Sequence, residues 1–162
     1  MRVKILIVCL CVFSFNAMAQ QIKSLTWQEA KEVLPESEFN DIESRSTAQQ
    51  PFSMLYDDGL FVNTDKNTTL FTQGYFSIDL IKDNPDFLKQ AADYKLIVID
   101  LDPSELIGSA QQDLSMYTSL EYIVVKYYNV SDWNQIFSDF QKLNQSKGNE
   151  LKIIGHLLEP KN

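Results

Sequence analysis

Short apolar runs alternate with segments of helical period in the second half of the chain. After Gly74, the runs that predict strands are residues 75–80, 95–101, 121–128 and 151–158, and the helices expected between them are residues 85–93, 103–116 and 131–143. Proline in the first turn of two of these helices, and Ser131 ahead of the third, are typical of helix starts. Because strands and helices that alternate in this way need crossover connections, the pattern predicts βαβαβαβ with a mainly parallel sheet.

The first 30 or so residues after Gln20 predict one helix and then a polar connector. Residues 24–34 place a hydroxyl group ahead of apolar positions at helical spacing, and a proline follows. Residues 36–50 contain only Phe39 and Ile42 as large apolar side chains. We therefore expect a mostly irregular segment here, with a mobile stretch around Ser44-Arg45-Ser46-Thr47.

A short antiparallel β section is expected between this connector and Gly74. The runs 52–56, 60–62 and 69–71 are aromatic or β-branched, and polar residues separate them. Asp58-Gly59 is typical of a type I′ hairpin turn, in which both central residues have positive φ. The expected fold class is therefore α/β, or α+β, with an N-terminal helix and an antiparallel section ahead of the parallel sheet.

The first 19 residues have the three parts of a secretory signal peptide. Arg2 and Lys4 are basic, the next run is apolar, and Ala17-Met18-Ala19 supplies a small-x-small cleavage pattern. The apolar run is shorter than the roughly 20 residues that a membrane-spanning helix needs. We expect cleavage before Gln20, one globular domain over residues 20–162, and no integral membrane segment in the mature chain. The protein is then periplasmic or secreted, and the style of the sequence favours a bacterial envelope.

Composition limits the chemistry that the mature domain can perform. Both cysteines, Cys9 and Cys11, lie in the signal segment, so disulfides, thiolate metal sites and a cysteine nucleophile are not expected. The formal net charge of the chain is −8, and an acidic surface repels phosphate backbones, so nucleic acid is not an expected partner. The glycine-rich loops that bind nucleotides are absent from the sequence, and no cofactor or metal is expected.

Two segments of the second half point to an internal repeat. Ser77-Ile78-Asp79-Leu80 is echoed by Val98-Ile99-Asp100-Leu101, and the six residues from Leu120 to Val125 match the L-x-x-L-x-L core of a leucine-rich repeat. Residues 75–158 thus resemble a short, degenerate leucine-rich-repeat segment, which implies a curved solenoid used for binding. The alternative is an ordinary layered α/β domain. We favour this alternative because a solenoid normally has at least three clear repeats.

Two carboxylates follow the apolar run at 95–101. Asp100-Leu101-Asp102-Pro103-Ser104 resembles the first motif of haloacid-dehalogenase-type phosphotransferases, in which the first aspartate is the nucleophile and the second transfers protons. This resemblance implies a small periplasmic hydrolase or phosphatase that uses Asp100 and Asp102. The chain departs from that family because no later Asp-Asp pair follows a strand to hold Mg²⁺. We favour the alternative that both carboxylates cap the next helix.

His156 is the only histidine of the chain and lies in the last predicted strand. A serine triad would need it, but Gly108-Ser109-Ala110 lacks the second glycine of a nucleophile elbow. A zinc site would need three or four strong ligands. We therefore expect a packed, hydrogen-bonded histidine rather than a catalytic one.

Aromatic side chains gather where the strand at 121–128 ends and the next helix begins. Tyr127, Tyr128 and Trp133 are a candidate platform for a glycan or a protein partner. The alternative is that they complete the core. Our leading hypothesis is an exported, non-catalytic binding protein that acts through the carboxyl edge of its sheet, and the hydrolase is the alternative.

Overall fold

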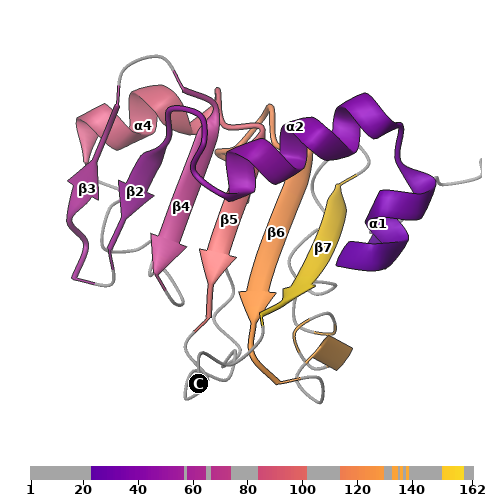
Figure 1. The fold of residues 1–162 in the computed structure, drawn as a ribbon. Helices are drawn as coiled ribbons and strands as arrows, with labels where there is room; N and C mark the ends of the chain where they lie inside the picture. The colour runs from indigo at the N-terminus through magenta and orange to yellow at the C-terminus, as the bar shows by residue number, and fades with distance from the viewer. Residues whose placement is uncertain are drawn as a thin grey trace, which may run out of the picture.

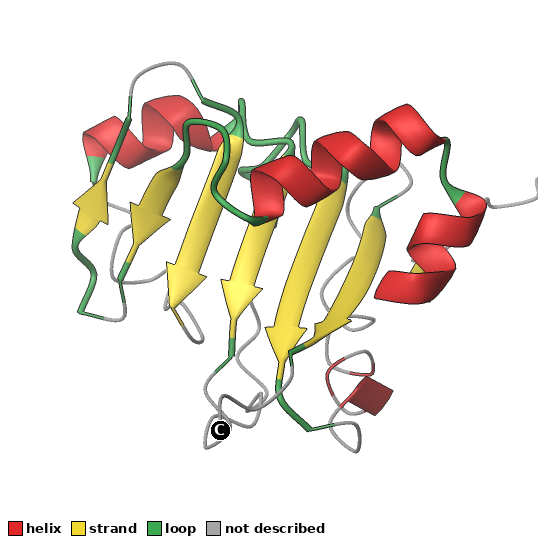
Figure 2. Ribbon diagram, viewed as in Figure 1, coloured by secondary structure: helices red, strands yellow, loops and turns green. Residues whose placement is uncertain are grey.

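The computed structural model describes residues 23–56, 58–64, 67–73, 84–101, 114–129, 133, 134, 136, 138 and 151–158. They form one seven-stranded sheet with helices on both faces (Figure 1, Figure 2). In chain order the elements are β1 (Lys23–Thr26), α1 (Trp27–Val33), α2 (Glu36–Ser46), β2 (Ser53–Leu55), β3 (Phe61–Val62), β4 (Thr69–Gln73), α4 (Pro85–Ala91), β5 (Leu96–Asp100), β6 (Tyr122–Tyr127) and β7 (Lys152–Leu157).

The strands lie in the order β1-β7-β6-β5-β4-β2-β3. Every neighbouring pair is parallel except β2 with β3. The expected α/β class with a mainly parallel sheet is confirmed. The strands predicted at 95–101, 121–128 and 151–158 correspond to β5, β6 and β7, and α4 corresponds to the helix predicted at 85–93.

The central strands β5 and β6 are apolar on both sides. Residues 96–99 and 122–125 are all buried, although successive side chains of a strand point to opposite faces. A strand of this kind is stable only where both of its faces are covered. This requirement explains why helices lie on both faces of the sheet.

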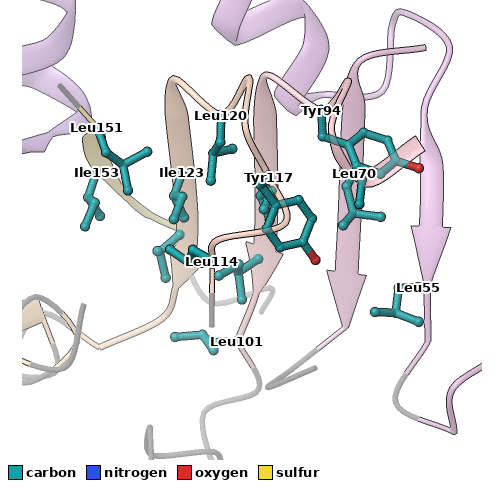
Figure 3. Packing of buried hydrophobic residues seen from close by; sticks show 14 of the residues in the cluster. Leu55, Leu70, Tyr94, Leu101, Leu114, Tyr117, Leu120, Ile123, Leu151 and Ile153 are labelled. Carbon is teal, nitrogen blue, oxygen red and sulfur yellow. The ribbon is translucent and has the colours of Figure 1, made fainter. Parts of the chain in front are cut away.

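One core lies on the face of the sheet that α4 covers. Figure 3 shows its side chains projecting from β4, β6 and β7 toward the segment that carries Leu114, Tyr117 and Leu120. Tyr94 is fully buried, and its hydroxyl donates a hydrogen bond to Gln90 Oε1 at 3.0 Å. This core therefore accommodates the polar end of a large aromatic residue.

The other core lies between the opposite face and helices α1 and α2. Ala30 of α1 and both Phe39 and Ile42 of α2 are buried against Val98 and Val124 of the central strands and their neighbours. Figure 1 shows α2 crossing the sheet near the amino ends of the strands.

Helix α1 begins at Trp27, three residues after the start of the helical pattern at Ser24. Its first turn is capped by Thr26, whose hydroxyl accepts from the Glu29 backbone N–H while the Glu29 carboxylate accepts from the Thr26 N–H. Residues 23–26 are extended and pair with β7 instead. The prediction of a helix from residue 24 is wrong because Leu25 is buried in the sheet and a better capping pair lies downstream.

The predicted irregular connector at 36–50 is also wrong, because residues 36–46 form the helix α2. The apolar face of this helix consists of Phe39 and Ile42 alone. Two apolar residues are too few to show the helical repeat of 3.6 residues in the sequence. Its third buried large side chain is polar: Arg45 is 8% exposed. The stretch around Arg45, expected to be mobile, is thus a packed part of the helix.

Arg45 fixes the carboxyl end of α2 to the start of β4. Its Nε donates to Thr69 Oγ1 at 3.0 Å, and its Nη2 donates to the Thr68 carbonyl oxygen at 2.9 Å and to Thr68 Oγ1 at 2.7 Å. Its Nη1 pairs with Asp41 Oδ2 at 3.1 Å. The buried guanidinium therefore donates to four oxygen atoms, whereas a lysine ammonium has only three N–H donors.

Glu38 fixes the other end of α2 to β6 and β7. Its carboxylate accepts a hydrogen bond from the Tyr122 hydroxyl. The same carboxylate forms an ion pair with Lys152, with 3.1 Å between Glu38 Oε1 and Lys152 Nζ. The hydrogen bond from Tyr122 is the main reason why the pKa of Glu38 is lowered. The pKa of Tyr122 is raised to about 12, mainly by burial and to a smaller extent by the same hydrogen bond. All these partners lie at the amino ends of their strands.

The antiparallel section is smaller than predicted. The hairpin of β2 and β3 is confirmed, with Met54 opposite Val62, but β4 runs parallel between β2 and β5. Of Asp58 and Gly59, the two central residues of the predicted turn, Gly59 has positive φ, 83°, and Asp58 does not, so the turn is not of type I′. The prediction that residues 69–71 belong to the antiparallel section is wrong, because the buried residues of β4, such as Leu70, continue the core of the parallel sheet.

Some predicted elements lie mainly or wholly outside the described residues. These are the strand at 75–80, Asp102 and the start of the helix at 103–116; Leu114, Ser115 and Met116 are described and are not helical. Trp133, Asn134, Ile136 and Ser138 are helical, as expected for 131–143. The order β4-β5-β6-β7 fits both a solenoid and a layered domain, so the leucine-rich-repeat resemblance stays a prediction.

Replacing Arg45 with methionine should destabilise the protein by about 2–3 kcal/mol, because the buried Thr69 hydroxyl and the Thr68 hydroxyl lose the hydrogen bonds that the guanidinium donates. Urea unfolding monitored by circular dichroism measures the change in the free energy of unfolding. Arg45→Lys should recover little of the loss, since an ammonium cannot reproduce the fork. Asp41→Asn is the matched control, because Asp41 is half exposed and its pair contributes about 0–1 kcal/mol. Equal losses for Asp41→Asn and Arg45→Met would contradict this account.

Candidate functional site

Four polar side chains lie in register at the carboxyl ends of four neighbouring parallel strands. Gln73 of β4 lies beside Asp100 of β5, Asp100 beside Lys126 of β6, and Lys126 beside His156 of β7. Residues in register on parallel strands point to the same face. We call this set, Gln73, Asp100, Lys126 and His156, the carboxyl-end row.

The carboxyl-end row lies on the face that α1 and α2 cover. Two residues earlier on the same strands, Phe71, Val98, Val124 and Ile154 form an apolar row that belongs to the core under these helices. Figure 2 shows the strands extending past α2 toward their carboxyl ends. Gln73 and Asp100 are exposed, and Lys126 and His156 are half-buried. With strands about 4.8 Å apart, the row spans roughly 14 Å.

Lys126 is the cation of this row. Its Nζ lies 5.5 Å from the centroid of the Phe71 ring, in the range of a cation–π interaction. Burial lowers the pKa of Lys126, and the neighbouring Asp100 carboxylate partly opposes this effect. The row therefore presents a partly desolvated ammonium next to an exposed carboxylate.

His156 ends the row on β7. Its ring stacks on Trp27, with centroids 4.1 Å apart and planes at 10°, and Trp27 in turn packs edge-on against Phe39 at 5.1 Å. The pKa of His156 is lowered, mainly by burial and to a smaller extent by the positive charge of Lys126. The negative charge of Glu43 raises this pKa and offsets part of the shift. The ring is packed, as expected from the sequence, but its Nδ1 is buried without a hydrogen-bond partner among the described residues.

Asp100, the first residue of the hydrolase hypothesis, belongs to the row. It is the last residue of β5 and is exposed, and Asp102 lies outside the described residues. In the part of the chain that the structure describes, no three His, Cys, Asp or Glu side chains are grouped so that they could hold a metal ion. The catalytic use of Asp100 and Asp102 stays a prediction.

Tyr127 and Trp133 of the predicted aromatic platform lie on the opposite face of the sheet. Tyr127 is 6% exposed, and its ring stacks on Trp133 with centroids 5.5 Å apart and planes at 13°. Both pack against the core that α4 covers, and Tyr128 is half-buried. The structure thus brings Tyr127 and Trp133 together, as neighbours in a core, and their role in binding a partner stays a prediction.

Sequence reasoning did not find Gln73, Lys126 or Trp27 as site residues. The signal that identifies the row is positional: Asp100 and Lys126 each come two residues after a buried residue of the same face, Val98 and Val124. This pattern becomes meaningful only once the register aligns the strands. A single polar residue at the end of a strand is common, so the sequence alone does not identify any one of them as a site residue.

The fold and the row define a small mixed α/β domain whose candidate site lies where parallel strands end. The chain matches no protein-family model, no curated protein and no solved structure. Within the described residues, no helix has the length and apolar character needed to cross a membrane.

Gly155 is needed because Trp133 lies directly over β7. A Cβ atom at Gly155 would lie 2.5 Å from the Trp133 ring. We expect Gly155→Ala to destabilise the protein by about 1–3 kcal/mol, because the ring or the strand must shift in a packed core. Urea unfolding of the single variant measures the cost.

The matched control for this prediction is the same substitution in a Trp133→Leu background. There the alanine methyl group has room, so the added cost of Gly155→Ala should fall well below its cost in the native chain. An undiminished cost would contradict the proposed steric cause.

Proposed function

We propose that this chain is an exported, non-catalytic protein that binds another macromolecule through the carboxyl-end row. The observation that carries the proposal is the alignment of Gln73, Asp100, Lys126 and His156 across four parallel strands. In open α/β sheets, ligands bind outside the carboxyl ends of the strands. Functional groups at this edge come from separate segments of the chain and are held by a buried sheet.

The chemistry of the row favours recognition rather than catalysis. An exposed carboxylate beside a half-buried ammonium gives a partner two charges of opposite sign in a fixed order, which specifies its orientation. The amide of Gln73 and the ring of His156 extend this pattern at both ends. A protein or glycan surface that presents both hydrogen-bond donors and acceptors fits such a row.

Export is supported by the sequence of residues 1–19 and by the acidic composition. The formal net charge of −8 opposes binding to nucleic acid and to anionic lipid. A signal peptide ending at Ala19 directs the domain to the periplasm or beyond. The partner is then another component of the cell envelope or its surroundings.

Reversing the charge of Lys126 tests the row as a binding surface. Tagged mature protein is incubated with the native envelope fraction and with an array of glycans, and bound components are quantified. Lys126→Glu should reduce capture of the specific partner by about tenfold, because a charge contact is replaced by repulsion. The matched control is Lys89→Glu on α4, whose side chain is 75% exposed on the other face, and it should bind as the native chain does. Equal capture by Lys126→Glu and the native chain would contradict the proposal.

The hydrolase alternative rests on Asp100 and has its own test. Phosphate release from p-nitrophenyl phosphate with Mg²⁺ is measured for the native chain and for Asp100→Asn. We expect no release by either protein and weaker partner capture by Asp100→Asn. Turnover by the native chain that Asp100→Asn abolishes would favour the enzyme instead.

A further inference from the structure

A ring stack joins the first residue of helix α1 to strand β7 of the sheet. Trp27 is the first residue of α1, and its ring lies 4.1 Å from that of His156 on β7. Phe39 of α2 contacts the same indole edge-on at 5.1 Å. One titratable ring thus lies in a series of three aromatic rings that links β7, α1 and α2.

We propose that this stack makes the position of α1 sensitive to pH: protonation of His156 weakens its contact with Trp27 and loosens α1 from β7. The inference concerns the fold itself and goes beyond the binding proposed above. The stack of His156 on Trp27 joins the end of the carboxyl-end row to helix α1, which covers the sheet.

The buried nitrogen of His156 is the first reason. Neutral imidazole carries one N–H group, so Nδ1 can remain an unprotonated acceptor in its buried place. Protonation puts a second N–H there, and Nδ1 has no hydrogen-bond partner in the described part of the chain. A charged donor without an acceptor is costly to bury, and the cost is relieved when the ring moves toward water.

The charged groups around the ring are the second reason. Lys126 of β6 lies in register with His156 and repels an imidazolium, whereas Glu43 of α2 attracts it. Trp27 of α1 carries no charge, although its ring face attracts a cation. That attraction does not provide the acceptor that a protonated Nδ1 needs.

The direction of the pH dependence follows from these groups. Burial and Lys126 lower the pKa of His156 in the folded protein below its ordinary value of 6.5. A released His156 takes up its proton at higher pH than the packed ring does. The contact is therefore at full strength above about pH 6.5 and is lost as the pH falls through the lowered pKa.

Trp27 fluorescence measures this contact directly. We expect one emission transition of the native chain with a midpoint below pH 6.5, while far-UV circular dichroism stays constant. His156→Gln should remove the transition. Trp27→Phe, which leaves Trp133 as the reporter on the other face, should also lack it. A transition that persists in His156→Gln, that coincides with loss of circular dichroism, or that is absent from the native chain between pH 8 and 4 overturns the proposal.

Two neighbours allow a second test that keeps His156 in place. Lys126→Met removes the repelling charge and should raise the midpoint by roughly half a pH unit or more, and Glu43→Gln should lower it. Both shifts are expected if His156 is the group that titrates. Identical midpoints in the three proteins would overturn the inference even if His156→Gln failed to fold.

Discussion

Two strands that must be buried on both faces impose the arrangement of the rest of this domain. Residues 96–99 of β5 and 122–125 of β6 expose almost nothing to solvent, and hydrophobic burial of this kind is the main favourable term in folding. Covering both faces requires α1 and α2 on one side and α4 with the segment around Tyr117 on the other. The polar ends of the strands then emerge at a defined edge, beyond the apolar rows.

Polar contacts at the two ends of α2 decide which part of the sheet this helix covers. Glu38 is held at the starts of β6 and β7, and Arg45 at the start of β4. These anchors place the helix over the amino ends of the strands (Figure 1). The carboxyl-end row consequently lies past the helix. A buried arginine, which the pattern of apolar residues does not reveal, is thus part of what positions the candidate site.

The alternation of side chains along β6 separates two groups that look alike in the sequence. Lys126 and Tyr127 are adjacent, but Lys126 points to the face of α2 and Tyr127 to the face of α4. The aromatic cluster at the end of β6 therefore packs against a core, and the polar row lies on the other side of the same strands. The binding proposal accordingly rests on Lys126 and its neighbours in register.

The sequence by itself determined the class of the fold, the strands β5, β6 and β7, the helix α4 and the hairpin of β2 and β3, because each has a local apolar period or turn residues of its own. Tertiary structure alone decided that residues 23–26 pair with β7, that β4 runs parallel, and that the region around Phe39 and Arg45 is helical. Those segments are short or polar, and contacts with distant residues outweigh their local preferences. The row was decided in the same way: its four residues are far apart in the chain, and only the register of a buried sheet brings them side by side.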